Sequence, residues 1–189
     1  MTAKLCVPPA VLFSIILMAL VINFITKPGI ALASSPPSIQ PENALDIKGS
    51  QCTLSHYFPD SIQQWCQIIE ENAAAVSLDP NLIAAVILQE SGGNPVVVSH
   101  SGAVGLMQVM PNDGIAASFQ CINGPCFASR PSSEQLMVPS FNVNYGTQML
   151  ANLFAKHGNI RDALYSYGPM SVGYSYADII LQIFHSAVS

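Results

Sequence analysis

The sequence predicts a mostly α-helical single domain that follows an N-terminal signal or anchor segment. Three observations support this prediction. Apolar residues recur at helical spacing through most of the chain, no run of alternating strands is visible, and 189 residues suit one domain with appendages. With 50% hydrophobic and 9% charged residues, the chain can bury a substantial core even without its N-terminal segment.

Residues 1–33 are expected to direct export. Lys4 precedes an apolar run over residues 11–25, and an Ala-Leu-Ala sequence ending at Ala33 has the small-x-small pattern of a cleavage site. The alternative is an uncleaved membrane anchor, because the mostly apolar residues 5–25 are long enough to span a bilayer. In either case the domain is expected outside the cytoplasm, secreted, periplasmic or facing the cell wall.

Residues 34–51 are rich in Pro and Ser and predict a linker, so residues 52–189 are expected to form the folded domain. Without residues 1–33 the chain keeps four basic residues against all 11 acidic ones. This balance excludes nucleic acid as a partner, because nucleic-acid binding relies on Lys and Arg to neutralise phosphates. It also disfavours docking to an anionic membrane surface, but it is compatible with a mostly uncharged polysaccharide.

The domain contains four cysteines, Cys52, Cys66, Cys121 and Cys126, and an even number in an exported protein predicts two disulfides. Three pairings are open. We favour Cys52 with Cys66 and Cys121 with Cys126, because short local loops close most easily. A zinc site is the alternative, but the four histidines are scattered and none pairs with a cysteine pair at ligand spacing.

The first helix of the domain is expected over about residues 61–76, with Asp60 as its cap. Trp65, the only tryptophan, lies at core spacing on this helix, which favours packing over a role as a sugar platform. Farther along, residues 96–98 are three valines that predict a short strand or an extended loop, and residues 112–139 are irregular and rich in Gly and Pro.

The most informative helix begins at Asp79, a good N-cap, followed by Pro80 at a position that suits the first helical turn. Glu90 lies on its apolar face at the last turn, before Gly92 and Gly93 end the helix. Partial burial and the negative end of the helix dipole both raise the pKa of such a carboxyl, as a general acid near neutral pH requires. The alternative is a solvated Glu at a fraying helix end.

Three further helices complete the prediction. Asparagine and glycine residues mark their ends, and their apolar residues fall at helical spacing. Their expected positions are Asn142 or Asn144 to about Lys156, Asn159 to Tyr165, and about Tyr174 to Ala187.

Three motifs resemble those of the soluble-type lytic transglycosylases, the SLT family, which share a goose-type lysozyme-like fold. Glu90-Ser91 matches the catalytic Glu-Ser of the family, and SHSGAVGLMQ, residues 99–108, matches its Ser-x-x-Gly-Ala-x-Gly-Leu-Met-Gln block. Residues 165–169, YSYGP, stand where the family usually has Tyr-Asn-Ala-Gly-Pro, with Ser166 in place of Asn. The resemblance extends from about residue 61 to the C-terminus.

This resemblance implies an enzyme that cuts peptidoglycan glycan strands between N-acetylmuramic acid and N-acetylglucosamine. The C6 hydroxyl of the muramyl sugar attacks its own C1 and leaves a 1,6-anhydro end, so one acid–base group, Glu90, suffices. The resemblance implies no cofactor and no metal, and we expect a monomer.

The resemblance also assigns roles to individual residues. Ser99 would help to place the reacting sugar, Gln108 would bind the glycan, and Met110 would be an apolar cleft residue. The Tyr165 hydroxyl would orient the catalytic carboxyl, and the remaining positions are supporting ones: Ser91, Gly105, where the backbone comes close to the sugar, and Met107.

Two other functions remain open at this stage. A lysozyme-like muramidase of the same fold would hydrolyse the bond with a water held by a second acid such as Asp113. A glycan-binding or assembly protein with weak or lost turnover is the other alternative, which the altered motif at Ser166 allows.

Overall fold

The computed structural model describes residues 52–189, and the predictions for residues 1–33 and 34–51 lie outside this range. Within the range the fold is mostly helical, as predicted. None of its helices is both long and apolar enough to cross a membrane. In chain order the elements are α2 (Asp60–Gln63), α3 (Cys66–Ala75), α4 (Pro80–Ser91), η1 (Gly114–Ser118), β1 (Gln120–Cys121), β2 (Gly124–Pro125), α5 (Ser133–Leu136), α6 (Pro139–His157), α7 (Ile160–Tyr167), η2 (Met170–Val172) and α8 (Ser175–Val188).

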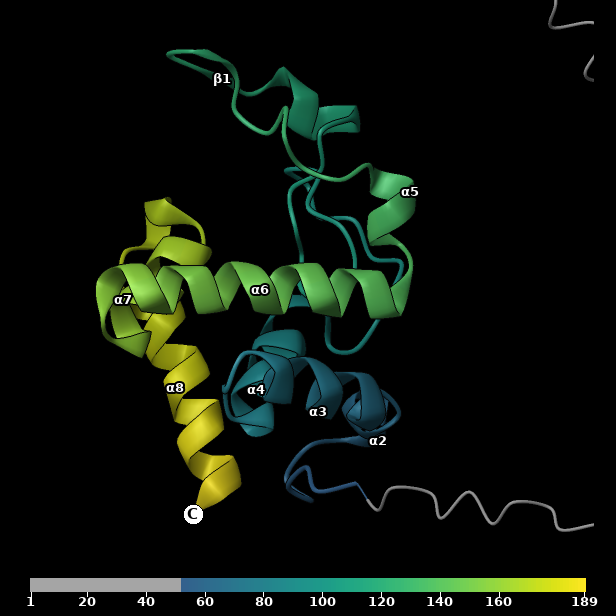
Figure 1. Ribbon diagram of the computed structural model, residues 1–189, viewed down its shortest axis with the longest axis vertical. Coiled ribbons are helices and arrows are strands. Elements are labelled where there is room, and N and C mark those ends of the chain that lie inside the picture. Colours follow the sequence, from purple (N-terminus) through teal and green to yellow (C-terminus); the bar gives the residue numbers. More distant parts are fainter. Residues whose placement is uncertain (1–51) are drawn as a thin grey trace, which may run out of the picture. The chain divides into compact units, whose positions relative to one another are not determined.

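Helix α4 lies at the centre of the core. Its residues 82–87 are all buried, which means that every face of this stretch is covered. Helices α3 and α8 pack against α4, and α6 packs against α3 and α7, as Figure 1 shows. A helix enclosed in this way is a rigid support for the residues at its C-terminal end.

The predicted first helix is two helices in the structure, because the chain turns at residues 64–65 between α2 and α3. Trp65 has non-helical backbone angles, and its Nε1 donates a hydrogen bond of 3.0 Å to the carbonyl of Gly93. The ring packs against the core and does not line the cleft described below, so the expectation of a packing role is confirmed.

The third predicted helix, α6, begins at Pro139, which the sequence analysis had placed in the irregular segment. Proline is tolerated there because the first helical residue has no intrahelical partner for its N–H. The short α5 before it was missed, although its signal is visible: Ser132 and Gln135 form a reciprocal capping box.

The remaining irregular part contains a small hairpin, in which β1 pairs with β2 in antiparallel register. We call residues 112–131 the hairpin segment. A hydrogen bond of 3.0 Å from the Asn112 N–H to the Pro131 carbonyl joins its two ends. A disulfide between Cys121 and Cys126 closes the hairpin, and Cys52 pairs with Cys66, so both favoured disulfides are present.

Candidate active site

Glu90 lies at the C-terminal end of α4, the helix at the centre of the core. Asp79 caps α4 by accepting a hydrogen bond of 2.8 Å from the Asn81 N–H, and Gly92 ends the helix in the left-handed conformation at φ 60°. These caps are the ones the sequence predicted. They fix Glu90 in the last turn, where it is partly buried and faces a cleft of about 900 Å³.

Burial raises the pKa of the Glu90 carboxyl from 4.5 to about 7. The hydroxyl of Tyr176, from α8, donates a hydrogen bond to Glu90 Oε1 and acts in the opposite direction by stabilising the charged form. No other hydrogen bond to Glu90 comes from the described residues, so Oε2 remains available to a ligand. A carboxyl with a pKa near 7 can both donate and accept a proton at neutral pH.

A side-chain hydroxyl holds the glycine-rich loop, residues 99–110, against the end of α4. The Ser91 hydroxyl donates to the carbonyl of Leu106 at 2.8 Å and to that of Ile87 at 3.1 Å. The hydroxyl can donate to only one of them at a time. Ser91 thus ties the residue after the candidate acid to the loop.

The fully buried amide of Asn142, on α6, is the second tie to this loop and was missed by the sequence analysis. Its Oδ1 accepts from the Met107 N–H at 2.8 Å, and its Nδ2 donates to the carbonyls of Val104 at 2.8 Å and Leu136 at 2.9 Å. Gly105, at φ 81°, has no side chain because a Cβ there would collide with this amide. The structure therefore gives Gly105 a packing reason.

Three of the predicted binding residues line the cleft together with Glu90: Ser99, Gln108 and Met110. Gln108 adopts φ 46°, and its Nε2 donates to the carbonyls of Val97 at 3.1 Å and Gly105 at 3.0 Å. Its amide nitrogen is therefore used to shape the loop. Ser99 Oγ accepts from the Ala103 N–H at 2.9 Å, which leaves the hydroxyl proton free to donate to a ligand.

The tyrosine prediction needs correction. Tyr165 does not line the cleft, and its ring stacks on Tyr174 with centroids 4.5 Å apart. Two residues farther along α7, Tyr167 lines the cleft and donates a hydrogen bond of 2.8 Å to the Met107 carbonyl. Residues two apart on a helix point about 200° away from each other, so only one of this pair can face the cleft.

The hydroxyl that contacts the candidate acid comes from Tyr176, which the sequence analysis did not single out. Its ring fits because Gly168 has no side chain, and a Cβ at Gly168 would collide with it. Burial, together with the charge of Glu90, raises the pKa values of both Tyr167 and Tyr176, so the two hydroxyls stay neutral hydrogen-bond donors. Met107, expected as a supporting residue, is fully buried in the core and contributes its backbone.

Ser166, which replaces the amide of the resembling family, lines the cleft beside Tyr167. Its Oγ lies 2.9 Å from His157 Nε2, within hydrogen-bonding distance. This contact links α7 to the imidazole in the last turn of α6.

Asp113, the candidate for a second catalytic carboxylate, is not among the residues that line the cleft. Both of its oxygens accept from the Ser133 N–H at 3.1 Å, and Oδ1 also accepts from the Ser133 hydroxyl. These hydrogen bonds lower the pKa of Asp113. The carboxylate anchors the start of the hairpin segment to α5, and the structure gives no support to a role in activating water.

One group in the described range combines enough potential metal ligands to be considered: Cys52, Cys66 and Glu70. The two sulfur atoms are bonded to each other, so neither is the thiolate that a metal requires. Glu70 Oε1 already accepts a hydrogen bond of 2.6 Å from the Thr53 N–H. This group is a structural feature of the chain's entry into α2 and not a metal site.

Comparisons with known proteins identify the family of this chain. The family model described as the transglycosylase SLT domain matches residues 67–172. The endo-type membrane-bound lytic murein transglycosylase A of Klebsiella pneumoniae strain 342 is 42% identical over 90 residues, which cover 48% of this chain and 43% of that protein. The membrane-bound lytic murein transglycosylase E of Buchnera aphidicola is 33% identical over 103 residues, 54% of this chain and 45% of that protein.

The match thus spans less than half the length of these curated relatives. Among solved structures, the crystal structure of the 70 kDa soluble lytic transglycosylase from Escherichia coli matches with a TM-score of 0.50 and 24% identity. The match covers 62% of this chain and 23% of that one, and it shows a shared fold.

Proposed function

Since the chain belongs to the transglycosylase SLT domain family, we propose that it is a lytic transglycosylase that cleaves peptidoglycan glycan strands. One observation carries the proposal: among the described residues, Glu90 is the sole carboxylate that lines the cleft, and its pKa is about 7. Hydrolysis with two carboxylates would need a partner for Glu90 in the cleft. A single acid–base group suffices when the substrate supplies its own nucleophile.

The proposed reaction has two proton transfers through the same carboxyl. Protonated Glu90 gives its proton to the glycosidic oxygen as the bond between this oxygen and C1 of the muramyl sugar breaks. The carboxylate that remains takes the proton of the C6 hydroxyl, and O6 bonds to C1. No water is consumed, the product ends in 1,6-anhydro-N-acetylmuramic acid, and Glu90 returns to its protonated form.

Tyr176 acts as a positioning residue in this scheme. Its hydroxyl holds Oε1, which leaves Oε2 for the substrate, and it stabilises the carboxylate that forms after the first proton transfer. Burial favours the protonated form that begins the reaction. The two opposing effects keep the pKa of Glu90 between the values that either would give alone.

Ser99, Gln108 and Met110 are proposed to contact the glycan beside Glu90. Ser99 offers a hydroxyl proton, Gln108 offers its Oε1, and Met110 offers an apolar surface to a sugar ring. The two disulfides support a location outside the cytoplasm, where such bonds persist, and the relatives described as membrane-bound are consistent with attachment through residues 5–25.

The test is mass spectrometry of the muropeptides that the purified protein releases from peptidoglycan. Wild type is expected to give anhydro ends, and Glu90→Gln is expected to give none. Glu71→Gln, the same chemical change at an exposed position on α3, is the matched control and should behave as wild type. Reducing ends would indicate a hydrolase, and stoichiometric binding without products would indicate a glycan-binding protein.

A further inference from the structure

The hairpin segment forms one wall of the cleft. Phe119 and Phe127 both line the cleft and meet edge to face with ring centroids 6.0 Å apart. A hydrogen bond of 2.9 Å from the Cys126 N–H to the Phe119 carbonyl and the Cys121–Cys126 disulfide fix their relative position. A segment with so little buried surface is thereby held as a preformed wall.

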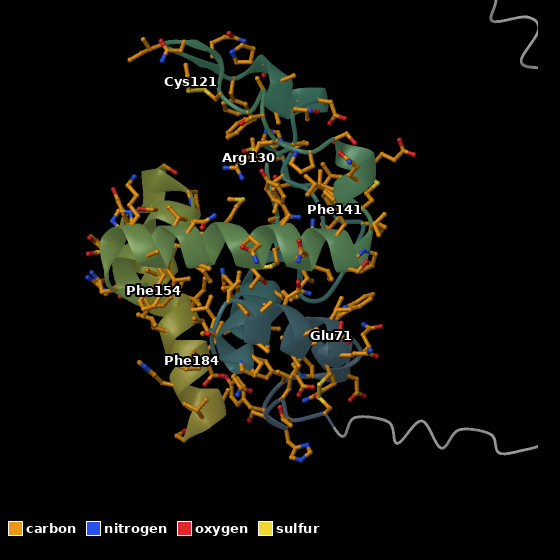
Figure 2. All side chains as sticks on the ribbon, viewed as in Figure 1. Glu71, Cys121, Arg130, Phe141, Phe154 and Phe184 are labelled. Carbon is orange, nitrogen blue, oxygen red and sulfur yellow. A yellow bond between two sulfur atoms is a disulfide. The ribbon has the colours of Figure 1, made fainter. Side chains whose placement is uncertain are left out.

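At the base of this wall stands Arg130, the sole cationic side chain among the described residues that line the cleft. Figure 2 shows it between the hairpin and α6. One guanidinium nitrogen contacts the sulfur of Met149, and the group lies 5.9 Å from the ring centre of Tyr145. Both contacts orient the side chain without neutralising its charge.

The donors of Arg130 are largely unused. A guanidinium carries five N–H donors in a planar fork, and a thioether sulfur is a weak acceptor. Within residues 52–189 the one ion pair joins Arg161 to Asp178, so no described carboxylate pairs with Arg130. A partly buried guanidinium with an open fork in a ligand cleft is suited to a carboxylate, which it can bind through two parallel hydrogen bonds.

A carboxylate bound to the Arg130 guanidinium would lie within electrostatic reach of the candidate active site. Tyr167 is affected by both charges of the cleft, since Glu90 raises its pKa and Arg130 lowers it. The two charged groups therefore act on one ligand-sized space. A ligand held by Arg130 would extend from the hairpin wall toward the sugar whose glycosidic oxygen Glu90 protonates.

We propose that Arg130 and the hairpin wall form a subsite for the anionic peptide stem of the glycan and select substrates whose stems carry free carboxylates. This inference rests on the proposed function. The sugar backbone of peptidoglycan carries no charge once its lactyl groups are joined to peptides, so the carboxylates of the stem are the anions that reach such a cleft. The apolar rings of Phe119 and Phe127 provide surface for the rest of the peptide.

The experiment compares two soluble glycan oligomers that differ only in their stems, whose carboxylates are either free or converted to amides. Wild type should cleave the free-carboxylate substrate with a kcat/KM roughly tenfold higher, the size expected from one charge-assisted contact. Arg130→Gln should lose this preference by slowing cleavage of the free-carboxylate substrate alone. Lys156→Gln removes the same charge from an exposed position on α6 and should keep the preference.

Equal rates of wild type on the two substrates would overturn the proposal, as would an Arg130→Gln variant that slows both equally. The first comparison needs no variant and so does not depend on whether Arg130→Gln folds. If wild type cleaves neither substrate, the proposed function fails. The subsite is then tested by measuring the affinity of the protein for the two oligomers. The Glu90→Gln protein should bind the free-carboxylate oligomer with a roughly tenfold lower Kd than the amidated one, and equal Kd values would overturn the subsite.

Discussion

Replacing Glu90 by Gln should stabilise the protein at neutral and alkaline pH while it abolishes catalysis. The wild-type carboxyl is partly buried at the end of α4, and its burial disfavours the charged form. A glutamine has nearly the same shape, can still accept a hydrogen bond from Tyr176, and has no charge to bury.

The magnitude follows from the pKa. In the folded protein the pKa is raised from 4.5 to about 7, which corresponds to about 3 kcal/mol at about 1.4 kcal/mol for each tenfold change in proton affinity. Below about pH 4.5 the group is protonated in both states and contributes nothing. Between about pH 4.5 and about pH 7 the unfolded chain has released the proton that the native state retains, so native stability falls until the pH passes the folded-state pKa. The full cost applies above the folded-state pKa.

Urea unfolding of wild type and Glu90→Gln at about pH 4 and about pH 8 checks this prediction. The two proteins should have similar free energies of unfolding at the lower pH, and the variant should be more stable by up to about 3 kcal/mol at the higher pH. Glu71→Gln, at an exposed site, should change the free energy of unfolding by less than about 0.5 kcal/mol at either pH. If Glu90→Gln matched wild type at the higher pH, burial would not penalise this carboxylate, and the reasoning for its raised pKa would be refuted.

Three other variants test the supporting contacts. Tyr176→Phe removes the hydrogen bond that lowers the pKa of Glu90, so the pH–rate profile should lose activity at a higher pH than wild type, with kcat reduced about tenfold. Asn142→Ala removes the partner of the buried Met107 N–H and of the buried Leu136 carbonyl, and leaves the Val104 carbonyl with its bond from the Val109 N–H alone. It should lower the free energy of unfolding by about 3–5 kcal/mol in urea titrations. Replacing both Cys121 and Cys126 by Ser should raise KM several-fold by loosening the cleft wall, while it lowers the free energy of unfolding by at most about 2 kcal/mol.

Two of these variants, Tyr176→Phe and Asn142→Ala, have a control of the same chemistry. Tyr174→Phe removes a hydroxyl that donates to Asp162 at 2.6 Å on the surface, and it should leave the pH–rate profile unchanged. Asn144→Ala removes an exposed amide of α6 and should cost less than about 1 kcal/mol. A profile that Tyr176→Phe does not shift, or an Asn142→Ala protein as stable as Asn144→Ala, would contradict the roles assigned to these contacts.

The features that the sequence predicted correctly depend on local information. Asp79, Pro80 and Gly92 lie at the ends of the helix they start or end, so their residue types alone place Glu90 in its last turn. The disulfide between Cys121 and Cys126 closes a loop with a sequence separation of 5, and short separations limit the competing pairings. Where the structure differs, as at the turn at Trp65, the residue contacts a distant segment, because its Nε1 donates a hydrogen bond to the Gly93 carbonyl.

The features that the sequence analysis missed are contacts between distant segments. Asn142 reaches the Met107 N–H over a sequence separation of 35, and nothing in a helix-forming stretch marks one asparagine as buried. The choice between Tyr165 and Tyr167 depends on how α7 is rotated about its axis against α6. That rotation is set by packing between the helices, and the motif at residues 165–169 does not show which of its two tyrosines faces the cleft.

The raised pKa of Glu90 shows how a correct expectation can rest on an incomplete cause. The sequence analysis attributed it to burial and to the end of the helix dipole, both of which belong to α4, and the structure identifies burial as the main cause. Helix α8 packs against α4 and brings the Tyr176 hydroxyl to Glu90 over a sequence separation of 86. A segment that begins 85 residues after Glu90 therefore supplies the hydrogen bond that moderates the acid. The pKa of Glu90 thus depends both on its burial at the end of α4 and on the Tyr176 hydroxyl of α8. Substitutions that displace α8 should therefore change the pH dependence of the reaction even when they do not alter a residue of the cleft.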